Sequence, residues 1–384
     1  MKTAAVICEY NPFHYGHKYQ LDKTREMGAT HIVAVMSGNF TQRGDAAIFD
    51  KYARARAALQ NGADLVLELP TRFSLSAAEG FARGAVSIIE ALGCVDMLSF
   101  GSESGDISAL KEAAGASEYA IHTDEFHELM RKGETFPSAL AKTVKNYYTD
   151  DVYEVLSSPN NTLAVEYIKA LDDIGSMIEP VTIQRNGADH DSDEETAMFA
   201  SASLIRKKIL SGGDYSEFAP VLNEPCADIH RLETAILSKL RTMKPADFEC
   251  VYDAAQGLGE RLYKAVRRAC SLDELYFLTK TKRYTLARIR RAVLCSFLDI
   301  DKKLLREPIA YIRILGMNTR GREILSAAQC GLPIDTSLKN LMKQSREAHR
   351  QGAFEERWGD IYSLAFEKPR PCGYEFTAKP VIME

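Results

Sequence analysis

Apolar runs alternate with segments of helical spacing along about the first hundred residues of the chain. The runs have the composition of strands, and they are Ala4–Cys8 (AAVIC), His31–Met36 (HIVAVM), Ala63–Leu69 (ADLVLEL) and Val95–Phe100 (VDMLSF). The segments of helical spacing lie between them, at His17–Met27, Lys51–Asn61 and Ala77–Leu92. Such alternation is typical of βαβ units, which assemble into a parallel sheet through right-handed crossovers. It predicts an α/β domain with a doubly wound parallel sheet.

The pattern becomes mainly helical in the second half of the chain. Helices are expected at Arg231–Leu240, Leu258–Cys270, Leu272–Leu278, Thr285–Leu298 and Arg320–Ala328. The turn Ser211-Gly212-Gly213-Asp214 precedes them, and two glycines after a helix are typical of a boundary. We therefore expect two domains, residues 1–213 and residues 214–384, and a surface loop at the acidic stretch 189–195 (DHDSDEE).

Composition adds few constraints to this picture. A chain of 384 residues exceeds what one hydrophobic core usually supports, which agrees with two domains. No apolar stretch approaches the roughly 18 residues of a membrane span, and the N-terminus lacks a cleavage-site pattern. We expect a cytoplasmic protein without membrane contact, and the oligomeric state is left open. The eight cysteines include no CxxC pair, which favours reduced thiols over a zinc site or a disulfide framework.

Three predicted strand ends carry small or polar residues that can approach a ligand. They are the segments 10–17, 37–44 (SGNFTQRG) and 101–106 (GSESGD). In doubly wound sheets, ligands bind beyond the carboxyl ends of the strands. The sequence contains neither GxxxxGK[ST] nor GxGxxG, so a bound nucleotide must be held in another way.

The stretch CEYNPFHYGH follows the first predicted strand and offers such a way. His14 and His17 are three residues apart and can share one face of a first helical turn, and Gly16 leaves room for a ligand. Helix N-termini bind phosphate through free N–H groups, and imidazole N–H groups add donors without a permanent charge. The alternative is that one histidine is a helix cap and the other an exposed ring.

NPFHYGH resembles the HxGH signature of the nucleotidyltransferase superfamily. SASLIR at 201–206 resembles its second motif, with Ser201 or Ser203 as a helix cap and Arg206 reaching the phosphates. Over most of the chain the sequence resembles the tRNA(Met) cytidine acetate ligase family, in segments such as VICEYNPFHYGH, KYARARAALQNGADLVLELP, SPNNTLAVEYIKAL and LTKTKRYTLARIRR. The resemblance implies a Rossmann-like nucleotidyltransferase domain followed by a mainly α-helical domain that docks tRNA.

The resemblance also implies the site residues. His14, His17 and Arg206 are the expected catalytic residues. ATP is expected to contact Ile7, Cys8, Glu9, Tyr10, Asn11, Pro12, Phe13, His14, Tyr15, Gly16, His17, Lys18, Tyr19, Gln20, Gly101, Asn160, Asn161, Arg185 and Ser203. Between the two adjacent asparagines Asn161 is preferred, as a cap of the following helix. Mg²⁺ is compatible with the reaction, but the sequence assigns no ligand to it.

The reaction implied by the resemblance joins acetate to the N4 amine of the wobble cytidine of elongator tRNA(Met). ATP first converts acetate into acetyl-adenylate, and the products are N4-acetylcytidine, AMP and pyrophosphate. Two rival functions stay open at this point. In the first rival function the chain is a cofactor-type adenylyltransferase acting on a small phosphorylated acceptor. In the second it is a tRNA-binding protein that kept the fold without catalysis.

Charge is distributed unevenly along the chain, which carries a formal net charge of −5. Residues 260–291 hold ten Lys or Arg against three Asp or Glu, so this stretch carries +7 and the rest carries −12. A basic stretch with interleaved aromatic residues suits phosphate contacts and base stacking, although a solvated helix face is an equally simple interpretation. With the family resemblance, we expect RNA contacts from Lys280, Lys282, Arg283, Tyr284 and Arg288.

Overall fold

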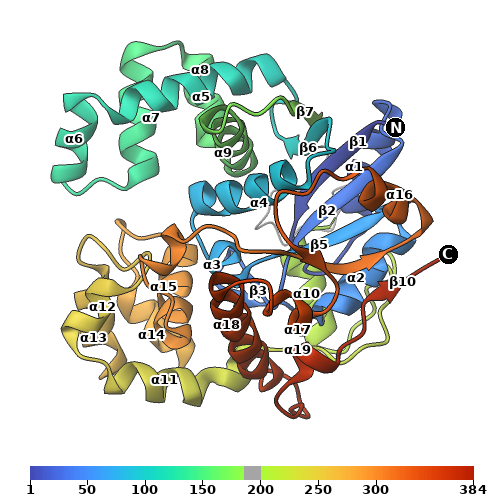
Figure 1. Cartoon of the computed structure of the whole chain (residues 1–384). Helices are drawn as coiled ribbons and strands as arrows, with labels where there is room; N and C mark the ends of the chain where they lie inside the picture. The colour runs from blue at the N-terminus through green and yellow to red at the C-terminus, as the bar shows by residue number, and fades with distance from the viewer. Residues whose placement is uncertain (186–199) are drawn as a thin grey trace.

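The computed structural model describes residues 1–185 and 200–384, so the acidic stretch 189–195, expected to be a surface loop, lies outside the described residues. A central sheet has the strand order β10-β8-β5-β2-β1-β6-β7 (Figure 1). The predicted strands are β1 (Thr3–Cys8), β2 (His31–Ser37), β5 (Leu65–Leu69) and β6 (Met97–Ser102), and the pairings among these four are parallel. β7 (Glu179–Gln184) pairs with β6, also in parallel. The predicted α/β class is confirmed.

Helices cover both faces of this sheet. The covering helices are α1 (Tyr15–Glu26) and α2 (Lys51–Gln60) on one face, and α4 (Ala78–Leu92) and α9 (Pro159–Asp173) on the other. Ile32 of β2 shares a core with Leu21 of α1, whereas Val33 shares a core with Phe81 of α4. Successive side chains of a strand point to opposite faces, and a parallel sheet covered on both faces therefore has continuous apolar strands.

The crossover from β6 to β7 contains a group of helices, of which only the last, beside Asn161, was expected from the sequence. It comprises α5 (Ile107–Ile121), α6 (Asp124–Arg131), α7 (Phe136–Tyr147), α8 (Asp150–Ser157) and α9. Figure 1 shows this group in green at one end of the sheet. Inner side chains of α5, α7, α8 and α9 join the same core as α4, so these helices are continuous with the α/β layer.

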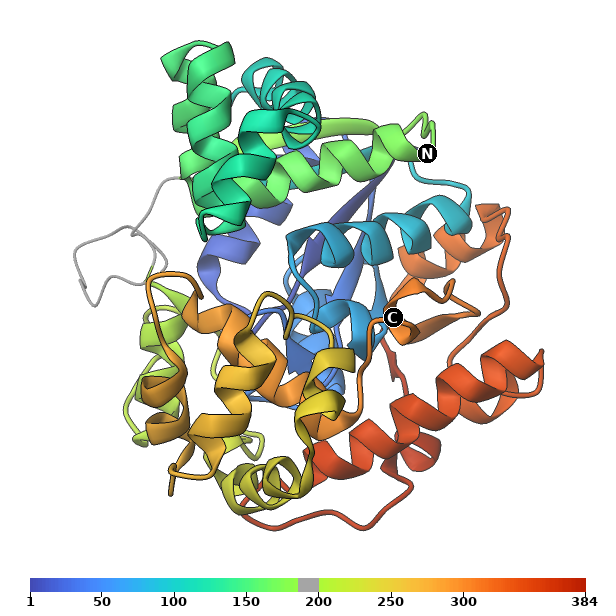
Figure 2. The same cartoon turned by 90° about the vertical axis from the view of Figure 1, so that its left-hand side faces the viewer.

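A second helical group follows residue 213, as predicted. It contains η1 (Ile229–Leu232), α11 (Glu233–Thr242), α12 (Pro245–Cys250), α13 (Leu258–Val266), α14 (Leu272–Thr279) and α15 (Leu286–Leu298). These helices have a core of their own, which the long helix α18 (Arg346–Ser363) joins through the buried Trp358. In Figure 2 their yellow and orange ribbons gather apart from the green helices of the β6–β7 crossover.

The end of the chain returns to the central sheet, which the sequence analysis missed. β8 (Ile312–Met317) pairs antiparallel with β5, and β10 (Val381–Ile382) extends the sheet beyond β8. The sheet thus takes strands from both sides of the predicted boundary at residue 213. Whether the chain divides there into two folding units stays a prediction.

The remaining elements are short connections, apart from the helices α10 and α16. They are β3 (Phe40–Thr41), β4 (Asp45–Ala46), α3 (Thr71–Ser74), α10 (Ala202–Leu210), η2 (Leu304–Arg306), α16 (Thr319–Ala327), β9 (Ile334–Asp335), α17 (Leu338–Leu341) and α19 (Tyr374–Thr377). Among the helices that the structure describes, none combines the length and the apolar composition needed to cross a membrane.

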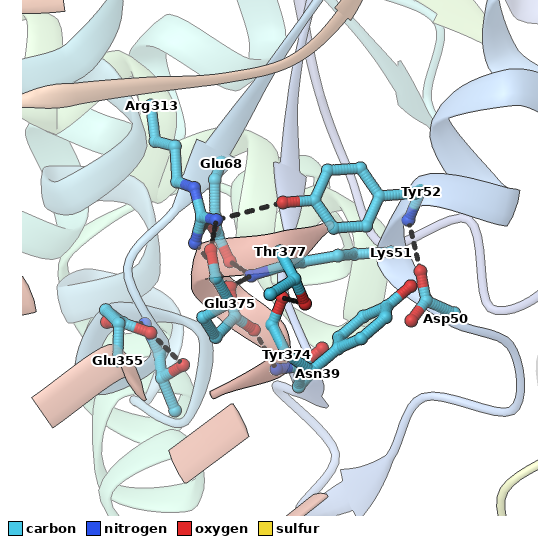
Figure 3. A network of polar contacts seen from close by, with 12 residues as sticks. Asn39, Asp50, Lys51, Tyr52, Glu68, Arg313, Glu355, Tyr374, Glu375 and Thr377 are labelled. Atoms are coloured by element: carbon cyan, nitrogen blue, oxygen red, sulfur yellow. Dashed lines mark hydrogen bonds and ion pairs between the residues drawn. The ribbon is translucent and has the colours of Figure 1, made fainter. Parts of the chain in front are cut away.

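A buried network of charges connects the C-terminal segment, residues 346–384, to the sheet (Figure 3). Lys51 at the start of α2 lies 2.6 Å from Oε1 of Glu68 on β5 and 2.7 Å from Oε2 of Glu375 on α19. Arg313 of β8 forms ion pairs with the same two carboxylates. All four side chains are at most 4% exposed. A third carboxylate, that of Glu355 on α18, accepts hydrogen bonds from the backbone N–H (2.8 Å) and the hydroxyl (2.6 Å) of Thr71.

We expect Glu355→Gln to change how stability depends on pH. Burial, together with the nearby charge of Glu68, raises the pKa of Glu355 from 4.5 to about 7. A carboxyl group with a raised pKa favours the folded state fully below its unfolded pKa, and this contribution is lost as the pH rises through 7. The loss amounts to up to about 3 kcal/mol. Glutamine cannot ionise, so the variant should lack this loss.

The check is urea unfolding at pH 5 and pH 8 for the wild type and Glu355→Gln. We expect the free energy of unfolding to fall less between the two pH values in the variant. The same fall in both proteins would contradict the assignment of this pH dependence to Glu355.

Candidate active site

A cavity of about 310 Å³ lies beyond the carboxyl ends of β1, β6 and β7. Its walls come from the end of β1, the start of α1, the loop after β2, and the starts of α9 and α10. β1 lies between β2 and β6, so the order of the strands along the sheet reverses at β1. Open α/β sheets bind ligands beyond the carboxyl ends of the strands at such a reversal. A volume of this size is at the lower end of the range for small-molecule sites.

The structure brings most of the predicted ATP-site residues to this cavity. The predicted residues that line it are Ile7, Cys8, Glu9, Tyr10, Asn11, His14, Gly16, His17, Tyr19, Gln20, Gly101, Asn160, Arg185, Ser203 and Arg206. The cavity lining does not include Pro12, Phe13, Tyr15, Lys18 or Asn161. Phe13 is buried in the core beside Tyr10, and Lys18 forms an ion pair with Asp22 on the helix surface.

The two histidines form the N-terminal cap of α1. The backbone N–H of Gly16 donates to Nδ1 of His14 (3.1 Å), and the N–H of His14 donates to Nδ1 of His17 (3.2 Å). The two rings are stacked, with their centroids 3.7 Å apart. Because each Nδ1 accepts an N–H, a neutral ring carries its proton on Nε2. Both histidines therefore act as caps of α1, and both line the cavity.

Arg206 links the second motif to the first. Ser201 caps α10 by accepting the N–H of Leu204 (3.2 Å), which decides between the two candidate caps. The other serine, Ser203, accepts a hydrogen bond from Nη2 of Arg206 (3.1 Å), whose Nη1 donates to the carbonyl oxygen of Asn11 (2.8 Å). Burial lowers the pKa of Arg206. A pre-positioned guanidinium in the cavity wall suits an anionic ligand.

The adjacent asparagines have different roles. Asn160 lines the cavity, and its Nδ2 donates to Oε1 of Glu103 (2.5 Å). Asn161 is 3% exposed, and its Oδ1 accepts the N–H groups of Glu103 (2.9 Å) and Ser104 (3.2 Å). The expectation that Asn161 caps its helix is wrong, because α9 begins at Pro159 and Asn161 lies inside its first turn. Asn161 instead holds the loop that follows β6.

Gly101 and Arg185 face each other across the ends of β6 and β7. A Cβ atom at Gly101 would lie 3.2 Å from Cγ of Arg185, which is closer than ordinary van der Waals contact. Arg185 is exposed, yet partial desolvation at the cavity wall lowers the pKa of its guanidinium, and the carboxylate of Glu103 partly offsets this effect. The small residue therefore leaves the space that the arginine side chain occupies at the cavity wall.

Sequence reasoning missed two parts of the cavity wall. One is polar and consists of Gln42 and Arg43 in the loop 37–44, which was indicated only as a strand end. The other is apolar and consists of Ala78, Phe81, Phe100, Leu163, Tyr167 and Ile183. Apolar residues of helices and strands are ordinary core positions in a sequence, so no motif indicates that they face a cavity.

Arg54 of α2 is a further residue that sequence reasoning missed. Its guanidinium is buried and donates to the carbonyl oxygens of Glu9 (2.6 Å), Ser37 (3.0 Å) and Gly38. These carbonyls follow β1 and β2, so one side chain joins the two strand ends that carry the cavity. Arg54 is a positioning residue, since it is not part of the cavity lining.

The predicted RNA-binding residues lie outside the cavity, around the start of α15. Lys280 and Lys282 are exposed, and Arg283 and Arg288 are partly buried. Tyr284 is only 5% exposed and its hydroxyl donates to the carbonyl oxygen of Gln256 (2.6 Å), so the prediction that it stacks on bases is wrong. The exposed aromatic side chain of this stretch is Phe277, which is 80% exposed.

Metal ligands cannot be assigned from the described residues. Within 1–185 and 200–384, no group of three or more His, Cys, Asp or Glu side chains is arranged to hold a metal ion. A magnesium ion that arrives with nucleotide phosphates needs only one or two protein carboxylates, so this finding leaves Mg²⁺ open.

The chain matches the HIGH Nucleotidyl Transferase family over residues 1–374. A tRNA(Met) cytidine acetate ligase of Thermoanaerobacter sp. is 35% identical over 98% of both chains, and that of Clostridium perfringens strain ATCC 13124 is 38% identical over 85% of this chain and 86% of its own. The crystal structure of Thermotoga maritima TmcAL bound with alpha-thio ATP has a TM-score of 0.91 and 32% identity, with both chains covered completely.

Proposed function

The chain belongs to the HIGH Nucleotidyl Transferase family, and from this premise we propose that it is an ATP-dependent ligase that joins acetate to the N4 amine of the wobble cytidine of elongator tRNA(Met). The observation that carries the proposal is the cavity that contains His14, His17 and Arg206, in a chain similar over its whole length to tRNA(Met) cytidine acetate ligases. A solved relative holds an ATP analogue, which supports ATP as the co-substrate.

The first step activates acetate, whose leaving group would otherwise be oxide. An acetate oxygen attacks the α-phosphorus of ATP, the bond to pyrophosphate breaks, and acetyl-adenylate remains. Negative charge accumulates on the phosphate oxygens in the transition state. The Nε2–H donors of His14 and His17 and the guanidinium of Arg206 line the cavity and supply pre-positioned positive density for that charge.

The second step transfers the acetyl group to RNA. The N4 amine attacks the acetyl carbonyl carbon, a C–N bond forms, and AMP leaves. Holding both reactants in one site can supply several kcal/mol without a covalent intermediate on the protein. The relatives compared above are named as tRNA(Met) cytidine acetate ligases. Their names favour a tRNA acceptor over the small phosphorylated acceptor of a cofactor-type adenylyltransferase.

The test is transfer of labelled acetate to bacterial tRNA that lacks N4-acetylcytidine. Label should appear on methionine tRNA only when ATP and wild-type protein are both present. A His17→Ala variant and a mixture without ATP are the controls. No label on any tRNA, with folded protein, would overturn the proposal and direct the search to small phosphorylated acceptors.

Charge reversal at the exposed lysines, Lys280→Glu with Lys282→Glu, is expected to weaken tRNA binding about tenfold or more. Lysines that contact phosphates release counterions on binding, so the slope of log K against log salt should also become shallower. The measurement is filter binding of tRNA at several salt concentrations. Charge reversal at Lys132, an exposed lysine directly after α6 in the other helical group, is the matched control. An equal effect of both changes would contradict a specific RNA contact.

A further inference from the structure

Glu9 is a partly buried acid in a cavity that also contains two histidines and an arginine. It follows β1 directly and lines the cavity together with His14, His17 and Arg206. Its Oε1 accepts the backbone N–H of Gln42 at 2.5 Å. The carbonyl oxygen of the same residue is held by Arg54 at 2.6 Å. Both its backbone and its side chain are therefore pre-positioned.

The position of Glu9 is unfavourable for phosphate binding alone. A carboxylate repels a triphosphate, and the residues that the structure describes include no ion pair between Glu9 and an arginine. Burial raises the pKa of Glu9, an effect that the Gln42 N–H and the charges of Arg206, Arg43 and Arg54 only partly offset. A partly buried carboxylate that lines a cavity and has a raised pKa suits a partner that donates a proton.

We propose that the Glu9 carboxylate accepts the proton that the cytidine N4 amine loses when it attacks the acetyl group. This role rests on the proposed function and assigns a residue to its second step. The nitrogen lone pair forms the C–N bond, and the C–O bond to AMP breaks with its electron pair leaving on the phosphate oxygen. One N–H proton passes to Glu9, and water later removes it and restores the carboxylate.

The surroundings of Glu9 match this role. A proton acceptor must be within hydrogen-bond reach of the amine, and Glu9 lines the cavity proposed to bind the reactants. The same cavity has an apolar wall that includes Phe100 and Tyr167. Such a wall excludes water and keeps the acetyl-adenylate from hydrolysis. The charged and titratable groups near Glu9 come from several elements. The arginines are Arg43 from the loop after β2, Arg54 from α2 and Arg206 from α10. The other groups are Cys8 and Tyr10 at the end of β1, His14 and His17 at the start of α1, and Tyr167 from α9.

Glu9→Gln removes the proton acceptor but keeps the hydrogen bond that positions the side chain, because the amide oxygen can still accept the Gln42 N–H. Two rates are measured with the full chain: acetate-dependent exchange of labelled pyrophosphate into ATP, and acetyl transfer to methionine tRNA. We expect the transfer rate to fall about 100-fold more than the exchange rate, because general base catalysis typically contributes 100-fold or more. The rise of the wild-type transfer rate with pH should be absent in the variant.

Asp45→Asn is the matched control. Asp45 is a second carboxylate close to Arg206 whose pKa burial raises, but it is not part of the cavity lining. This change should leave the ratio of the two rates as in the wild type. Equal losses of exchange and transfer in Glu9→Gln would overturn the proposal and indicate a role in the first step, such as holding Mg²⁺. An unchanged transfer rate would also overturn it, whereas a wild type without either rate would instead overturn the proposed function.

Discussion

His17→Asn is expected to lower the rate of acetate-dependent pyrophosphate exchange by about 100- to 1000-fold with the fold intact. Loss of one pre-positioned donor to a developing oxyanion typically has an effect of this size. The side chain of asparagine places an oxygen where Nδ1 of His17 accepts the N–H of His14, so the cap of α1 is kept. What is lost is the Nε2–H donor. The measurement is the exchange rate, alongside thermal unfolding of both proteins.

His17→Gln is the complementary variant. Glutamine can extend its amide N–H towards the position of Nε2, and its oxygen can still accept the His14 N–H, as Gln does at the N3 position of a capping box. We expect it to keep more activity than His17→Asn at a stability similar to that of the wild type. The opposite order of activities would contradict the donor role of Nε2.

Local patterns were sufficient to predict the parallel sheet and the histidine pair. Each of the strands β1, β2, β5 and β6 is an apolar run followed by polar residues, and this pattern requires no knowledge of distant contacts. The histidine pair is equally local, because His14 and His17 bond to backbone groups within three residues. Ser201 and Arg206 also contact Leu204 and Ser203 within one helical turn, but the role of Arg206 was predicted from the family resemblance and not from the local pattern.

Long-range contacts explain what the sequence could not predict. Arg54 lies in the stretch KYARARAALQ, where an arginine resembles a surface residue, but its partners lie up to 45 positions away. β8 was missed for the same reason. Arg313 interrupts its apolar run, and only the carboxylates of Glu68 and Glu375 make the burial of that arginine favourable.

Two predictions were wrong for another reason: that Asn161 caps α9, and that Tyr284 stacks on bases. Asn160 and Asn161 differ in which face of α9 they occupy, and the start of that helix at Pro159 decides it. Tyr284 lies in a basic stretch, yet the helical group needs it as a core residue beside Ile289. Neither register nor burial can be inferred from composition.

The buried charge network also bears on the active site. Nδ2 of Asn39 donates to Oε1 of Glu375 (3.1 Å), and Asn39 begins the turn that carries Gln42 and Arg43 to the cavity. From the other side, Nη1 of Arg291 on α15 donates to the carbonyl oxygen of Gln42 (3.0 Å). The loop after β2 is thus held by the C-terminal segment and by the second helical group together.

Lys51→Met is therefore expected to destabilise the protein by about 3–5 kcal/mol, the usual effect of removing one partner from a buried ion pair. It leaves Glu68 and Glu375 with only Arg313 between them. Burial alone would raise the pKa of Glu375, but Lys51 and Arg313 lower it to about 2. A carboxylate with a lowered pKa stabilises the fold above its unfolded pKa of 4.5 and loses this effect as the pH falls towards 2. Without Lys51 this loss should begin at a higher pH, which urea unfolding between pH 3 and pH 7 measures.

The double variant Lys51→Met with Glu68→Gln tests whether Lys51→Met destabilises the protein through an uncompensated buried charge or through a packing defect. It restores the balance of one cation, Arg313, against one anion, Glu375, while Glu355 keeps its bonds to Thr71. If the cost of Lys51→Met comes from unbalanced buried charge, the double variant should be more stable than the single one, since removing both partners of a buried pair is often nearly neutral. If the two losses simply add, the network acts through shape and packing, and its charges contribute little to holding the C-terminal segment on the sheet.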